Sequence, residues 1–110
     1  MNDTNSHAPE SGSPPRGAWL RRLKGRAQLL EPVLKVGKAG LSPELLAALD
    51  EALAQHELVK VRFEHFKERE RRKQLAAEMA ARTGSHLIQQ VGHVAVLFRA
   101  RPADPQPPGH

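Results

Sequence analysis

The distribution of proline confines any fold of this chain to its middle. Seven of the nine prolines lie outside residues 19–101, and serine and glycine crowd the same two ends. Segments of that composition bury too little apolar surface to offset the entropy lost on ordering. We therefore expect disordered tails at residues 1–17 and 102–110, and one domain at residues 18–101. A segment of this length is long enough for a single hydrophobic core.

The charge is concentrated in the same middle segment. Residues 19–101 hold 16 Lys and Arg against 9 Asp and Glu, a net charge of +7, whereas the whole chain carries +5. A basic surplus of this size indicates an acidic partner, most often nucleic acid. There is no cysteine, which excludes disulfides, a thiol nucleophile and thiolate zinc sites. No apolar run approaches the ~20 residues of a membrane span, and residues 1–15 lack a signal-peptide pattern. We expect a soluble cytoplasmic protein without membrane contact.

Apolar periodicity and the helix-breaking residues predict seven elements. Ser42 is a suitable N-cap, Pro43 suits the first helical position, and Leu58 to Phe63 alternate apolar with basic residues. The sequence predicts helices over 19–28, 43–55 and 67–83, and strands over 33–36, 58–63, 87–91 and 94–98. Strand–helix–strand links favour parallel pairing, and Gly92-His93 favours an antiparallel hairpin. The predicted fold is a compact two-layer α/β domain of order α-β-α-β-α-β-β with a mixed four-stranded sheet.

The inventory of reactive side chains argues against an enzyme. Ser42 is better explained as a helix cap, and it falls on the same helix as Asp50, the one aspartate of residues 19–101, which disfavours a catalytic triad of the two. No two histidines there have the i, i+4 spacing of a helical metal site. We predict no catalytic activity, no metal, no cofactor and no small-molecule substrate.

A glycine loop, Gly37-Lys38-Ala39-Gly40, lies between a predicted strand and a predicted helix. Glycine lets a backbone approach a ligand closely, and unpaired N–H groups at a helix start suit a phosphate. Lys38 adds a positive charge. An ordinary tight turn is the alternative, because the loop has neither the spacing of the nucleotide-hydrolase phosphate loop nor that of a dinucleotide fingerprint.

Basic residues surround this loop in the sequence. Lys35, Lys60 and Arg62 alternate with apolar residues and should share one face of the sheet. The predicted contacts also include four cations of the first helix and the end of the last strand: Arg21, Arg22, Lys24, Arg26 and Arg99. The segment 67–73 stays open between a solvated face and a binding surface, since Glu68 and Arg72 have the spacing of a local ion pair. With only four aromatic residues, recognition should rest on phosphates more than on base stacking.

Several segments together resemble the YhbY-like family, the bacterial form of the CRM (chloroplast splicing and ribosome maturation) domain. They include Leu30-Glu31-Pro32-Val33, Val36-Gly37-Lys38-Ala39-Gly40-Leu41, His56-Glu57-Leu58-Val59-Lys60-Val61, Thr83-Gly84 and Leu97-Phe98-Arg99. The resemblance implies a fold similar to the C-terminal domain of translation initiation factor three, RNA binding through the GxxG loop, and association with precursors of the large ribosomal subunit. Gln90 departs from a commonly aliphatic strand position, and His93 from a common lysine.

These observations predict a monomeric RNA-binding protein that acts in ribosome assembly, with ribosomal RNA and pre-large-subunit particles as partners. A general RNA chaperone or intron-binding module would use the same contacts. A protein-interaction adaptor, whose charge serves only solubility, is the alternative from another class. A DNA-binding protein is less expected, because no base-reading helix is evident.

Overall fold

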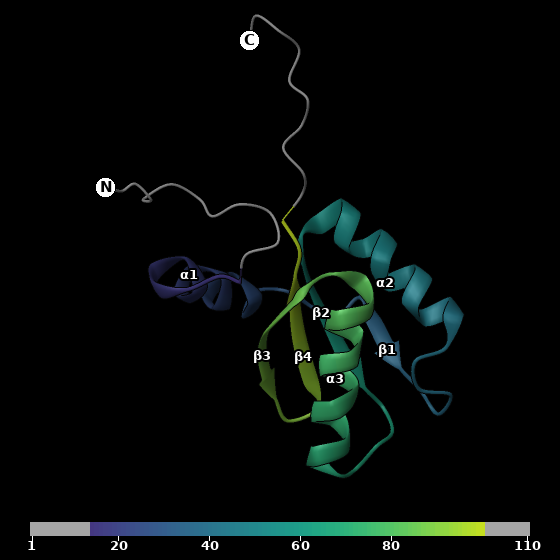
Figure 1. Ribbon diagram of the computed structural model, residues 1–110. Coiled ribbons are helices and arrows are strands. Elements are labelled where there is room, and N and C mark those ends of the chain that lie inside the picture. Colours follow the sequence, from purple (N-terminus) through teal and green to yellow (C-terminus); the bar gives the residue numbers. More distant parts are fainter. Residues whose placement is uncertain (1–13, 101–110) are drawn as a thin grey trace, which may run out of the picture.

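Seven elements follow one another in the computed structural model, which describes residues 14–100 (Figure 1). They are α1 (Gly17–Ala27), β1 (Leu34–Val36), α2 (Pro43–His56), β2 (Leu58–Phe63), α3 (Arg69–Thr83), β3 (His86–Val91) and β4 (Val94–Phe98). The predicted order is confirmed, and each boundary lies within two residues of the predicted one. Of the predicted tails, only residues 14–17 lie among the described residues. Pro15 is buried there, and Gly17 begins α1.

The four strands form one mixed sheet in the order β1-β2-β4-β3. β1 runs parallel to β2, with α2 as the crossover between them, and β4 runs antiparallel to both of its neighbours. Gly92 adopts a φ of +58° in the turn between β3 and β4, a conformation that glycine adopts at low cost. The predicted mixed sheet and its C-terminal hairpin are therefore both confirmed.

The main core lies between the sheet and the pair α2 and α3, which cover one face (Figure 1). Leu49 and Leu53 of α2 and Leu75 and Met79 of α3 form the apolar stripes that their spacing predicts. They pack on the side chains that β2 and β4 direct to this face. The cluster consists of Val36, Leu49, Leu53, Val59, Val61, Phe63, Leu75, Ala76, Met79, Ala80, Ala95 and Leu97.

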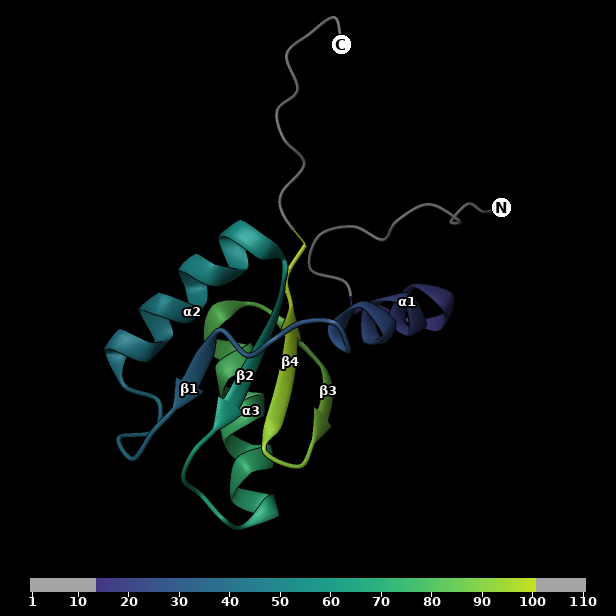
Figure 2. The same cartoon turned by 180° about the vertical axis from the view of Figure 1, so that it is seen from behind.

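α1 packs on the opposite face of the sheet, called here the back face (Figure 2). Its residues Leu23 and Ala27 are buried against Leu58, Ile88, Val96 and Phe98, and the Trp19 and Phe98 rings meet edge-on with centroids 5.1 Å apart. This second cluster joins the start of β2 to the end of β4. The helix therefore adds a partial layer to the predicted two-layer core and leaves the far half of the back face open.

Candidate nucleic-acid interface

The glycine loop forms a tight turn at the end of β1. The Gly40 N–H donates to the Gly37 carbonyl oxygen at 3.0 Å, and Gly40 has a φ of +71°. A residue with a side chain rarely adopts this left-handed conformation, so the turn requires glycine at its fourth position. Lys38 and Ala39 occupy the exposed tip. Within residues 14–100 the Lys38 ammonium has no ion pair, which leaves its charge available to a ligand.

The start of α2 offers fewer free amides than a typical helix N-terminus. Ser42 is the N-cap, as predicted, and its Oγ accepts from the Leu45 N–H at 3.1 Å. Pro43 has no N–H, so Glu44 carries the remaining free amide of the first turn beside its own carboxylate. An anion at this turn would therefore be bound mainly by the Lys38 ammonium and by the amides of Lys38 and Ala39.

Phe66, in the loop between β2 and α3, packs its ring near Gly40 of the glycine turn. Its ring carbon Cζ lies 3.6 Å from the position that a Cβ on Gly40 would occupy. Phe66 itself has a φ of +72°, an unusual conformation for a bulky residue that persists only where the surroundings impose it. The Phe66 ring therefore packs close to the turn, and the backbone of Phe66 is itself constrained.

Three predicted cations lie on the back face, two of them level with the end of β1 and Lys60 farther from the turn. Lys35 and Arg62 are partners in the parallel register of β1 and β2, and Lys60 lies two residues before Arg62. This confirms the prediction that they share one face. Arg62 is exposed, Lys35 forms an exposed pair with Glu64 at 3.6 Å, and the Lys60 ammonium donates to the Leu30 carbonyl oxygen at 2.9 Å. Exposed pairs of this kind contribute little energy, so Lys35 can exchange its partner for a phosphate.

The four cations of α1 lie farther away. Figure 2 shows α1 and the glycine turn on opposite sides of the molecule, because α1 packs against Phe98 and Ile88 rather than against β1. Arg26, in its last turn, lines a shallow groove of about 370 Å³ together with Lys60. The structure thus connects the C-terminal end of α1 to the sheet-face cations, while Arg21 and Arg22 lie exposed one to two turns earlier, and Lys24 is half-buried.

Arg99 lies at the end of the sheet opposite the glycine turn, where its guanidinium links two helices. Its Nη1 donates to the Asp50 Oδ1 at 2.6 Å and to the Thr83 carbonyl oxygen at 2.8 Å, while Nη2 donates to the Asp50 carbonyl oxygen at 2.9 Å. These bonds tie α2 to the end of α3. The structure does not bring Arg99 together with the other predicted contacts.

Arg72 of α3 is the residue whose role the sequence did not reveal. The local pair with Glu68 that the spacing allows does not form: no carboxylate pairs with this guanidinium among the described residues. The Arg72 side chain is 7% exposed. Its Nε donates to the Gly92 carbonyl oxygen at 3.0 Å, and Nη1 donates to those of Phe66 and Lys67 at 2.9 and 2.7 Å. Arg72 therefore connects the hairpin turn to the loop that carries Phe66.

Residues 14–100 present no grouping of three His, Asp or Glu side chains that could hold a metal ion. None of the helices in that range is long and apolar enough to cross a membrane. The charged features beside the first strand are a basic sheet face and an exposed lysine in a glycine turn.

The element order and the four-stranded mixed sheet define a small α/β domain, in which a glycine turn follows the first strand. The CRS1/YhbY (CRM) domain matches residues 16–99, and the chain belongs to that family. A probable RNA-binding protein of Pseudomonas aeruginosa is 38% identical over 82 residues, which cover 74% of this chain and 78% of that protein. An RNA-binding protein of Haemophilus influenzae is 36% identical over 77 residues, which cover 70% of this chain and 77% of the relative.

A solved structure has the same fold. The solution structure of a hypothetical protein from Staphylococcus aureus, a candidate RNA-binding protein, superposes with a TM-score of 0.66 at 28% identity. The match covers 74% of this chain and 83% of that one. The names of these relatives state RNA binding and no catalytic activity.

Proposed function

We propose that this protein binds RNA through the glycine turn and the basic back face, and that it acts in assembly of the large ribosomal subunit. The observation that carries the RNA assignment is the placement of Lys38, in an exposed GxxG turn, next to Lys35 and Arg62 on the open half of the sheet. The family membership supports it, because the named relatives are RNA-binding proteins.

The mechanism is clamping of the RNA backbone. Gly37 and Gly40 let the strand approach the turn, whose free amides and Lys38 bind one phosphate. Arg62, Lys35 and Lys60 bind the phosphates that follow along the sheet, and Arg26 extends the row at the end of α1. The open part of this face includes no aromatic ring among residues 14–100, so affinity depends on charge more than on stacking.

Salt dependence separates this proposal from a protein-interaction adaptor. If about 4–6 phosphates are contacted, the logarithm of the affinity for single-stranded RNA falls with the logarithm of salt concentration at a slope of about −3 to −4. Fluorescence anisotropy with a labelled oligonucleotide between low and physiological salt measures this slope. Absence of binding, or a slope near zero, would contradict the RNA assignment and favour the adaptor.

The ribosomal assignment needs a test of its own. In gradient sedimentation of cell extracts, tagged protein should migrate with precursors of the large subunit and separate from mature ribosomes. Migration elsewhere while RNA binding persists would favour the general RNA chaperone or the intron-binding module.

A further inference from the structure

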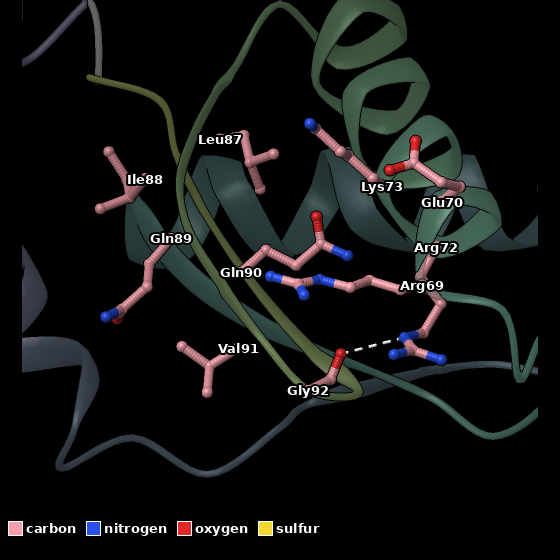
Figure 3. Close-up of a pocket in the computed structure, with 10 residues that line it drawn as sticks. All are labelled: Arg69, Glu70, Arg72, Lys73, Leu87, Ile88, Gln89, Gln90, Val91 and Gly92. Carbon is pink, nitrogen blue, oxygen red and sulfur yellow. Dashed lines mark hydrogen bonds between the residues drawn. The ribbon is translucent and has the colours of Figure 1, made fainter.

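A groove runs along the other side of the sheet, between α3 and the edge strand β3 (Figure 3). Its volume is about 840 Å³, and the first half of α3 and most of β3 line it. Figure 3 shows Leu87 and Gln90 directed toward α3, and the Arg69 side chain reaching toward Gln90. Gln90, whose position departs from the family's aliphatic preference, therefore presents a polar amide to an open groove instead of filling the core.

The groove is basic. Arg69, Arg72 and Lys73 line it, against Glu70 as the one acidic lining residue. Arg69 and Lys73 are one turn apart, exposed, and without ion pairs or hydrogen bonds among the described residues. Arg72 adds a buried positive charge whose polar partners, among the described residues, are three carbonyl oxygens and the His93 ring. A charge shielded from water and not neutralised by a carboxylate raises the local potential, which favours a polyanion.

The irregular pairing of β3 argues against a β-strand of a partner protein as the occupant of the groove. A peptide that adds to a sheet edge needs a regular row of backbone donors and acceptors. β3 is irregular, because its pairing with β4 shifts between Leu87 and Gln89. Bulges of this kind protect edges from strand addition. The combination of basic side chains, the Gln90 amide and a bulged edge suits the phosphates of a nucleic acid strand.

The glycine turn and one end of the groove lie at the same end of the sheet. The His93 carbonyl oxygen accepts from the Phe63 N–H at 2.7 Å, and the Val36 carbonyl oxygen accepts from the Glu64 N–H at 2.9 Å. The hairpin turn and the start of the glycine turn thus flank the end of β2, and the exposed Lys67 lies in the loop that follows it. This loop links the two sites, because the Phe66 ring packs near Gly40 and the carbonyl oxygens of Phe66 and Lys67 accept from Arg72.

We propose that the α3–β3 groove is a second RNA-binding site, occupied by another stretch of the same RNA strand whose backbone the glycine turn holds. This rests on the proposed RNA-binding function and extends it to a surface on the other face of the sheet. It assigns Arg69, Lys73 and Gln90 as contacts for phosphates or sugars, so that within the segment 67–73 Arg69 and Lys73, which line the groove, bind the RNA.

The test compares RNA lengths in the double variant Arg69→Glu, Lys73→Glu. A single-stranded oligonucleotide of about 4 nucleotides spans only the glycine turn, whereas one of about 12 nucleotides reaches the groove as well. The variant should bind the short RNA like wild type and the long RNA about tenfold more weakly, with the salt slope for the long RNA reduced by about 1.4. Both substitutions lie on an exposed helix face, so circular dichroism should show an unchanged fold.

The matched control is the double variant Arg71→Glu, Arg82→Glu. It lowers the net charge by the same four units, and both of its residues lie outside the groove lining. It should bind the long RNA within about twofold of wild type. Equal losses on short and long RNA, or equal losses in the two double variants, would overturn the second site. The second site would also be overturned if the groove variant lost affinity for an acidic peptide and kept its affinity for both RNAs. If wild type binds neither RNA, the proposed function itself has failed.

Discussion

Replacing Arg72 with alanine is expected to lower the free energy of unfolding by about 2–4 kcal/mol. The substitution removes the donors of three hydrogen bonds, to the carbonyl oxygens of Gly92, Phe66 and Lys67, and leaves a void beneath the hairpin. Hydrogen bonds from a charged donor contribute about 1.5–3 kcal/mol each, and water recovers part of that loss because Gly92 and Lys67 are exposed. Urea denaturation followed by circular dichroism measures the change.

Two further variants separate the role of the bonds from that of the charge. Arg72→Lys keeps the charge but can satisfy fewer of the three carbonyl oxygens, so it should recover only part of the lost stability. Arg71→Ala, which removes an exposed side chain with a 3.5 Å contact to Gln74, should change stability by no more than about 0.5 kcal/mol. Equal effects at positions 71 and 72 would refute the bracing role of Arg72.

The double variant Lys38→Glu, Arg62→Glu is expected to weaken RNA binding about 100-fold at physiological salt. Each substitution replaces a cation that binds a phosphate with an anion that repels one, and both side chains are exposed. Neither residue contributes to the buried clusters, so the midpoint of thermal unfolding should stay within a few degrees of the wild-type value. Fluorescence anisotropy with RNA of about 12 nucleotides reports the affinity.

The double variant Arg71→Glu, Arg82→Glu again serves as the control, because it also lowers the net charge from +5 to +1. It should retain affinity within about twofold, since non-local charges are screened at physiological ionic strength. Comparable losses in both variants would mean that net charge, rather than the glycine turn and its neighbours, determines binding.

Local signals in the sequence were sufficient to predict the elements and their order. The Ser42-Pro43 pair locates the start of α2, and the alternation from Leu58 to Phe63 locates β2 together with the face on which Lys60 and Arg62 lie. These features depend on a few neighbouring residues, whose conformational preferences act before any tertiary contact forms. The glycine turn is predictable for the same reason.

Side-chain partners distant in sequence were not predictable. Arg99 and Asp50 are 49 residues apart, and Arg72 and Gly92 are 20 apart, so their bonds exist only because the helices pack on the sheet. The proximity of Arg21 and Arg22 to the glycine loop in the sequence also suggested one continuous surface. The packing of α1 against Phe98 places them elsewhere. A spacing that fits a local pair, as in Glu68 and Arg72, cannot show that a guanidinium turns inward.

The division of the apolar residues between two faces gives the molecule two levels of stability. Twelve buried residues hold α2, α3 and the sheet together, whereas six form the cluster that holds α1. The free energy of opening an element scales with the apolar surface that it buries. We therefore expect α1 to detach at a lower free energy than the rest unfolds, and its amide protons to exchange with solvent faster than those of β2 and β4. Each such opening should uncover Ile88, Val96 and Phe98 and extend the open back face over the whole sheet.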